Sequence, residues 1–134
     1  MATIFDVAKY ILDKQGSMSA MKLQKLAYYS QAWSLVWDEE PLFDQDFEAW
    51  ANGPVAPALY SEHRGLFQVD STLFSSSNPG NLNATQKESI DQVLDFYAGF
   101  TAQMLSDLTH KEAPWNDARG DLEPMARCSE VITK

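Results

Sequence analysis

Few side chains in this sequence could carry out covalent chemistry or hold a metal ion. There are two histidines, His63 and His110, and one cysteine, Cys128. The sequence contains no HExxH or CxxC pattern, no GxSxG nucleophile motif and no phosphate-binding P-loop. A cysteine near a chain end is more often a small buried hydrophobic residue than a nucleophile. We therefore expect no cofactor and no metal site, and the histidines are the remaining candidates for catalysis.

His110 is better placed than His63 for acid–base chemistry. Asp107 lies three residues before it and Glu112 two residues after it, so a carboxylate could orient the imidazole. A small enzyme that uses His110 as its base is one interpretation. The other is structural: His110 binds backbone groups at the C-terminal end of a helix, where a cationic imidazole is also favoured. His63 follows Glu62 directly, and adjacent residues on a helix do not face the same way, so they form a poor catalytic or metal-binding pair.

Lys22, Lys25 and Tyr29 form a polar stripe on an otherwise apolar segment. Their spacing of three and four residues places them on one side of a helix that is predicted over residues 19–37. A buried ammonium group is costly unless it is paired. In a structural interpretation, one lysine extends to solvent and the other pairs with a carboxylate, for which Glu48 is the first candidate.

The functional interpretation of the stripe is a shallow polar pocket that binds a partner. Its side chains would come from the stripe and from two later segments: Lys22, Lys25, Tyr29, Trp50, Tyr60, His110 and Trp115. Tryptophan and tyrosine are enriched at binding hot spots, but they are equally common as large core residues. The tryptophans of the chain therefore do not establish an interface by themselves.

Periodic apolar residues predict a mainly α-helical, compact domain around a buried central helix. Helices are expected over residues 3–14, 19–37, 54–63 and 85–108. Thr3 and Ser19 are typical N-cap residues, and Thr85 with Glu88 matches a capping box. The second helix has apolar residues on opposite sides, which indicates that protein covers it all round.

The segment before the third helix shows strand-like alternation. Residues 47–50 predict a short strand, with a turn at Asn52-Gly53-Pro54. A short β-hairpin is expected near residues 42–51, in which Leu42-Phe43 pairs with that strand. Pro54 is expected to begin the third helix, since proline is favoured in a first turn.

The size and charge of the whole chain limit its possible partners. Its 134 residues are the length of one domain, which we expect to span residues 1–134. The net charge is −9, and no Lys or Arg occurs between Lys25 and Arg64 or between Glu88 and His110. Nucleic-acid binding requires clustered cations, so direct contact with DNA or RNA is not expected. No apolar stretch approaches the roughly 20 residues that span a bilayer, and no signal peptide is evident, so we expect a cytoplasmic protein without membrane contact.

Three segments resemble the motifs of a known family. Residues 21–33, MKLQKLAYYSQAW, resemble the KLQKLxYY signature of the Panacea (SocA-like) antitoxin domain. Residues 47–60 resemble its EAWxxGPVxPxLY block, and residues 105–115 resemble its LSxLTHxxxPW block. The order and relative spacing of the three segments also match, and together they cover most of the chain.

The resemblance implies a binding protein, because no enzymatic activity is established for the family. Its members are small helical proteins of bacteria and prophages, and many neutralise a cognate toxin by direct protein–protein interaction. A proteolytic-adaptor role, in which the protein delivers the toxin to a cellular protease, is also attributed within the family. Partner choice is then expected in the less motif-like parts, such as residues 66–84 and the acidic segment 38–48, since loops on a rigid scaffold vary most easily.

Overall fold

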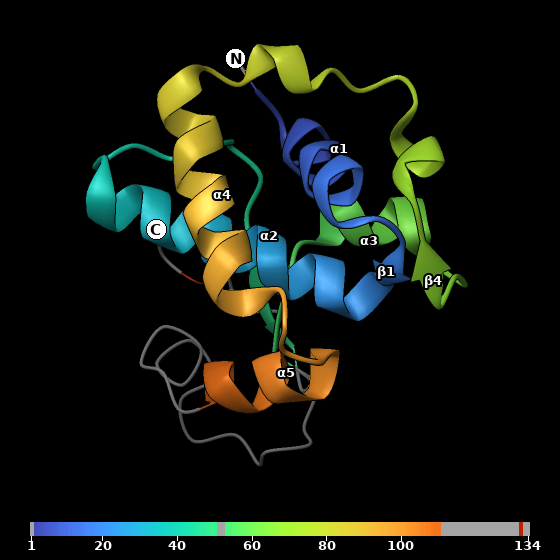
Figure 1. Ribbon diagram of the computed structural model, residues 1–134. Helices are drawn as coiled ribbons and strands as arrows, with labels where there is room; N and C mark the ends of the chain where they lie inside the picture. Colours follow the sequence, from blue (N-terminus) through green and yellow to red (C-terminus); the bar gives the residue numbers. More distant parts are fainter. Residues whose placement is uncertain (1, 51–52, 111–131, 133–134) are drawn as a thin grey trace.

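The fold is mainly α-helical, as the sequence predicts, with two short two-stranded antiparallel sheets among the described residues (Figure 1). The computed structural model describes residues 2–50, 53–110 and 132. In chain order the elements are α1 (Ile4–Gln15), β1 (Met18–Ser19), α2 (Ala20–Trp37), β2 (Glu48–Trp50), β3 (Gly53–Val55), α3 (Pro57–His63), β4 (Gln68–Val69), two 3-10 turns (Ser71–Phe74 and Pro79–Asn81), α4 (Ala84–Tyr97) and α5 (Ala102–His110).

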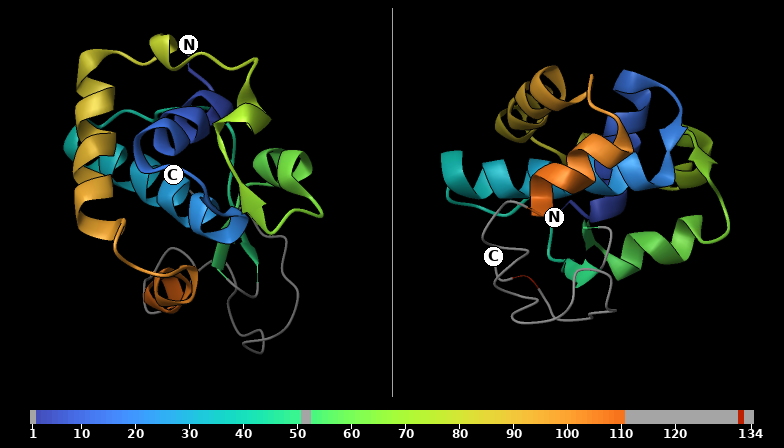
Figure 2. Two further views of the ribbon diagram at one scale, coloured as in Figure 1. Left: turned by 45° about the vertical axis from the view of Figure 1, so that its right-hand side comes forward. Right: turned by 90° about the horizontal axis from the view of Figure 1, so that it is seen from below.

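Helix α2 runs through the centre of the molecule, and α1, α4 and α5 pack around it (Figures 1 and 2). Every residue from 23 to 31 is buried. This confirms the prediction of a buried central helix, which follows from apolar residues on all sides. Across the described residues, no helix is both long and apolar enough to cross a membrane.

Local capping interactions fix where the first two helices begin. The Thr3 hydroxyl accepts a hydrogen bond from the Asp6 N–H at 3.4 Å, and the Asp6 carboxylate accepts one from the Thr3 N–H at 3.0 Å, which is a capping box. The Ser19 hydroxyl accepts a hydrogen bond from the Lys22 N–H at 3.1 Å. Both predicted N-caps are therefore confirmed. Gly16 ends α1 with a φ of 80°, which few residues other than glycine adopt.

The hairpin is present, but its second strand is not the predicted one. Strand β2 confirms the strand expected over residues 47–50, and it pairs with β3. The expected pairing with Leu42-Phe43 is wrong, because the Gln31 side chain binds the Leu42 N–H at 2.7 Å and the Phe43 carbonyl at 3.0 Å. Pro54 consequently lies in a strand. Helix α3 begins with Pro57, which is the proline that occupies the first turn.

The single helix expected over residues 85–108 is wrong, because the chain forms two helices there. Helix α4 ends at Tyr97, and α5 begins after Thr101, whose hydroxyl accepts a hydrogen bond from the Met104 N–H at 3.1 Å. Gly99 lies in the break, and glycine is unfavourable in a helix interior. The turn directs α5 back beneath α2 (Figure 1).

The N-terminal end of α4 also differs from the prediction. Its capping box is formed by Asn83 and Gln86, two residues earlier than the expected Thr85 and Glu88. Asparagine is among the best N-cap residues. The two additional residues bring the start of α4 close in sequence to the 3-10 turn at Pro79–Asn81.

Candidate functional site

The three motif segments meet at Gly53, the first residue of β3. Gly53 has a φ of +112°, and a Cβ at this position would lie 2.7 Å from Lys25 Cε and 2.9 Å from Thr109 Oγ1. Lys25 belongs to the first segment, Gly53 to the second and Thr109 to the third. Such a close approach leaves room only for glycine, so Gly53 joins α2, the hairpin and α5 in one packed centre.

Lys25 is buried in this centre, with 1% of its surface exposed. Its ammonium group donates a hydrogen bond to the Pro54 carbonyl oxygen at 3.0 Å. Burial lowers the pKa of Lys25 to about 7, because desolvation disfavours the charged form. Near neutral pH a large share of Lys25 is therefore uncharged, which reduces the cost of its burial.

The expected ion pair between the polar stripe and Glu48 is wrong. Among pairs in which both residues are described, the one ion pair joins Lys9 and Asp13. The Glu48 carboxylate instead accepts a hydrogen bond from Trp50 Nε1 at 2.9 Å. The other stripe lysine, Lys22, is half-buried and donates to the Ala98 carbonyl oxygen at 2.5 Å. Ala98 is the C-cap of α4, where a cation stabilises the exposed carbonyl groups.

Gln24 is the interior residue that the sequence interpretation missed. Its side chain is fully buried, accepts a hydrogen bond from the Ala56 N–H at 2.9 Å and donates one to the Ala56 carbonyl at 3.3 Å. Its Nε2 also lies 2.9 Å from His63 Nε2. A glutamine inside an apolar helix, next to Lys25, was the available signal, since buried amides need partners.

His63 completes this interior polar group. It is buried, and burial lowers its pKa, with the nearby Lys25 charge acting in the same direction and a hydrogen bond to its own backbone opposing them. The neutral imidazole can accept the hydrogen bond that the Gln24 amide donates. His63 therefore has a structural setting, consistent with its poor prospects for catalysis.

The predicted pocket residues divide between two regions. Trp50 contacts Tyr60 edge to face, with ring centroids 5.1 Å apart, and both are half-buried. Tyr29 is buried and stacks on Tyr97 of α4, with centroids 4.3 Å apart. The structure thus brings Trp50 and Tyr60 together and places Tyr29 against α4. The side chain of His110, at the end of α5, and the whole of Trp115 lie outside the described residues.

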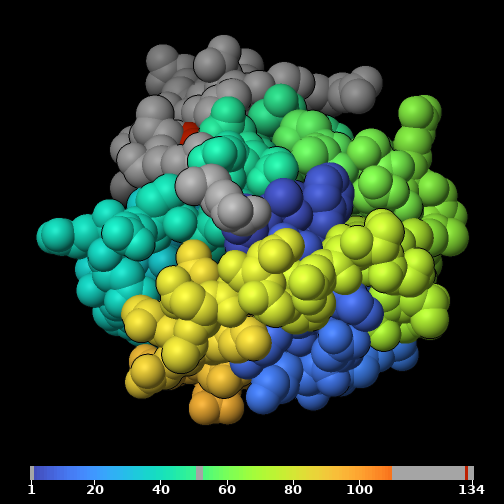
Figure 3. Space-filling view, turned by 90° about the horizontal axis from the view of Figure 1, so that it is seen from above, coloured from blue at the N-terminus to red at the C-terminus, as the bar shows by residue number. Residues whose placement is uncertain are grey.

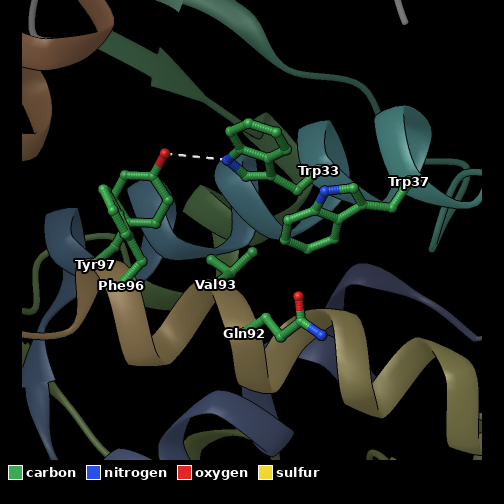
Figure 4. Close-up of a pocket in the computed structure, with 6 residues that line it drawn as sticks. All are labelled: Trp33, Trp37, Gln92, Val93, Phe96 and Tyr97. Atoms are coloured by element: carbon green, nitrogen blue, oxygen red, sulfur yellow. Dashed lines mark hydrogen bonds between the residues drawn. The ribbon is translucent and has the colours of Figure 1, made fainter.

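A separate apolar cavity of about 410 Å³ lies between α2 and α4 (Figure 4). We call it the aromatic groove; its lining residues are Trp33, Trp37, Gln92, Val93, Phe96 and Tyr97. Trp33 stacks on Trp37 with centroids 5.0 Å apart, and Trp33 Nε1 donates a hydrogen bond to the Tyr97 hydroxyl at 3.0 Å. Trp37 is 44% exposed and Phe96 is 67% exposed. The groove thus opens to solvent and is lined by ordered aromatic rings.

An adjacent polar cavity of about 290 Å³ lies where α2 ends and α4 begins. We call it the acidic cavity; it is lined by Ser34, Asp38, Glu40, Asn83, Thr85 and Gln86. The Asp38 carboxylate accepts a hydrogen bond from the Ser89 hydroxyl at 2.8 Å. Figure 3 shows the segment that follows α2 beside the start of α4. Trp33 and Trp37 line the aromatic groove, and the residues that directly follow them, Ser34 of α2 and its C-cap Asp38, line the acidic cavity, so the two cavities are neighbours.

Comparison with known proteins identifies the family of the chain. Residues 23–116 match the family model described as Antitoxin SocA-like, Panacea domain. A curated relative, Antitoxin SocA of Caulobacter vibrioides (strain NA1000 / CB15N), is 41% identical over 58 residues. That region is 40% of this chain and 31% of the relative, so the chain matches about a third of the relative's length. No solved structure matches the chain. Because the family model covers most of the chain, including the residues that meet at Gly53, the chain belongs to the SocA-like antitoxin family with a Panacea domain.

Proposed function

We propose that this chain is an antitoxin that neutralises a cognate toxin by binding it directly in the cytoplasm. The observation that carries the proposal is the family match over residues 23–116. The name of the matched relative, Antitoxin SocA, agrees with it. Neutralisation by direct contact requires a surface of exposed side chains, not a catalytic centre.

The division between interior and surface supports this proposal. The motif residues Gln24, Lys25 and Thr109 are buried and hold the fold together. Of the predicted pocket residues, Lys22, Trp50 and Tyr60 are partly exposed, so they can contact a partner. Lys25 and Tyr29 are buried, so they can affect binding only through the packing of α2. His110 and Trp115 are proposed partner contacts because they belong to the third motif segment.

The test is co-expression with the genes on either side. Each neighbouring reading frame is induced alone and then together with this chain. We expect one of them to stop growth alone and to allow growth when co-expressed, and we expect the two proteins to co-purify. Rescue without any complex would contradict direct neutralisation.

The same strains distinguish blocking from proteolytic delivery. If the chain only blocks the toxin, toxin levels stay constant or rise when the chain is present. If it acts as an adaptor, toxin levels fall, and they fall only in cells that contain the protease. We propose the blocking mechanism. A protease-dependent decrease in toxin level would contradict it and support the adaptor role.

We also infer that the chain is not an enzyme. His63 is enclosed by Gln24 and Tyr60, so His110 is the remaining histidine for catalysis. We expect the substitution His110→Gln to change toxin binding and neutralisation together or to change neither. Loss of rescue with toxin binding and thermal stability both unchanged would instead support the enzymatic alternative.

A further inference from the structure

The aromatic groove and the acidic cavity lie side by side on α2 and α4 and differ in chemistry. We propose that together they bind one segment of the partner protein, which carries a large apolar side chain for the groove and lysine or arginine residues beside it for the acidic cavity. The inference rests on the proposed function, because it specifies the kind of toxin surface that the antitoxin recognises.

The apolar half of the surface has the properties of a binding hot spot. Ligand pockets commonly have volumes of roughly 300–1,000 Å³ and apolar or aromatic walls, and the groove fits that description. Phe96 is largely exposed, yet it contacts Tyr97 edge to face at a centroid distance of 4.7 Å. Rings that neighbouring rings already hold in place lose little conformational entropy on binding.

The charge of the surrounding surface selects the partner's polar residues. Asp38 and Glu40 line the acidic cavity, and Glu39 is exposed between them. The carbonyl groups at the C-terminal end of α2 add partial negative charge. Along α4, Glu88 and Asp95 are exposed, and Lys87 is its one basic residue. Complementary charge determines specificity and speeds association, so this surface favours a basic segment.

The same charge argues against a second copy of this chain as the occupant. Each copy has a net charge of −9, so two acidic surfaces would repel each other. The longest stretches without Lys or Arg, between Lys25 and Arg64 and between Lys87 and Lys111, include the parts of α2 and α4 that line the aromatic groove. A basic partner therefore fits the surface better than the chain itself does.

A pair of synthetic peptides tests the chemistry without knowledge of the toxin. One is an amphipathic helical peptide of Leu and Lys, and the other has Glu at every Lys position. Binding is followed by the tryptophan fluorescence of the protein, to which Trp33 and Trp37 contribute, and by calorimetry, at low and high salt. We expect the Leu/Lys peptide to bind at least about tenfold more tightly than the Leu/Glu peptide and to weaken with salt. Equal affinities would overturn the proposal.

Matched variants locate the binding site. Phe96→Ala removes an aromatic ring of the groove, and Phe67→Ala removes a ring that is 77% exposed next to β4. We expect Phe96→Ala to weaken Leu/Lys peptide binding by about tenfold or more, and Phe67→Ala to leave it unchanged. Likewise, Glu40→Lys should weaken binding, whereas Glu62→Lys, at an exposed position of α3, should not. Equal effects within either pair would contradict the assignment, provided that circular dichroism shows folded proteins.

The same variants, tested with the toxin, separate this inference from the proposed function. If wild-type protein rescues growth and binds the toxin, but Phe96→Ala binds it equally well, the groove is not the toxin site and the proposed function stands. If no neighbouring protein is bound or neutralised, the proposed function fails, whatever the peptides do. If gel filtration shows a dimer that Phe96→Ala dissociates, a second copy occupies the groove and the inference is wrong.

Discussion

At the scale of single residues, Lys25 shows how a helical core accommodates a basic group. Its ammonium group binds a backbone carbonyl, and its pKa falls to about 7. The spacing of Lys22, Lys25 and Tyr29 correctly indicated polar groups on a buried helix. It could not identify their partners, because Pro54 and Ala98 reach the helix only through the tertiary fold.

The depressed pKa of Lys25 predicts that stability rises with pH above neutrality. The unfolded chain holds a proton on Lys25 up to a pH near its ordinary pKa of 10.5, whereas the folded chain releases it near pH 7. Between these values the unfolded state binds more protons, so the free energy of unfolding increases with pH, by up to about 1.4 kcal/mol per pH unit.

Lys25→Met removes the titrating group while keeping a similar side-chain volume. Urea unfolding of both proteins across pH 7–10 should therefore show a rise in the wild type that the variant lacks. Tyr10, whose pKa burial and Asp91 raise to about 12, is common to both proteins and cancels in the comparison. Parallel profiles of the free energy of unfolding against pH in the two proteins would show that Lys25 has an ordinary pKa in the folded state.

The packing around Gly53 predicts a large effect of a single methyl group. Gly53→Ala places a Cβ against Lys25 and Thr109 and keeps a φ that alanine adopts with strain. We expect a loss of about 3 kcal/mol or more in the free energy of unfolding. Gly99→Ala is the control, because its Cβ would meet nothing within 4 Å. A loss under about 1 kcal/mol for Gly53→Ala would refute the tight contact.

At the scale of elements, local signals placed the starts of the first two helices, but they missed the Asn83 cap of α4 and the break before α5. Thr3 and Ser19 cap α1 and α2 as the sequence predicted, because an N-cap depends on residues within one turn. The hairpin partner was wrong, since strands that short can pair with either neighbouring segment. The pairing of β1 with β4 joins Met18 to Val69, and no local pattern encodes a pairing at that separation.

Asp6 links the first helix to the loop that precedes α4. Its carboxylate accepts hydrogen bonds from the Asn78 N–H at 2.8 Å and from the Asn81 side chain at 3.1 Å. Burial raises the pKa of Asp6, but these bonds and those from Thr3 together outweigh burial and leave the pKa below its usual value. The ionised carboxylate therefore stabilises the segment that leads into α4.

The lowered pKa of Asp6 predicts that this residue contributes to how stability changes at acid pH. Because its folded pKa is depressed, its contribution is complete above the ordinary pKa of 3.8 and is lost as pH falls through the folded value. Asp6→Asn should lower the free energy of unfolding by about 1–3 kcal/mol at neutral pH and flatten the acid side of the stability profile. Asp13→Asn, which removes a surface ion pair with Lys9, should change little. Equal losses in the two variants would rule out the special role of Asp6.

At the scale of the whole molecule, the motif residues and the two cavities of the proposed partner surface are mostly different residues, although Trp33 belongs to both. Residues of all three segments that carry the resemblance to the family meet inside the protein at Gly53. The aromatic groove escaped prediction, because Trp33 and Trp37, one helical turn apart, suit either a core or a surface. Their exposure depends on how α4 crosses α2 and where α4 ends, and the break at residues 98–101 was not predicted.

The acidic surface indicates how the complex should respond to solution conditions. Because Asp38, Glu39 and Glu40 follow α2, and Glu88 and Asp95 are exposed on α4, association of the proposed surface with a basic partner should slow as ionic strength rises. Phe96 and Trp37 should instead govern how slowly the complex dissociates, as aromatic anchors commonly do.

The most direct test of antitoxin action by contact is a titration of the purified chain with the purified toxin whose growth arrest it relieves. We predict saturable binding by calorimetry at the concentrations present during rescue, and loss of toxin activity in proportion to the complex formed. Full rescue in cells, together with no detectable binding of the two purified proteins, would contradict neutralisation by direct contact.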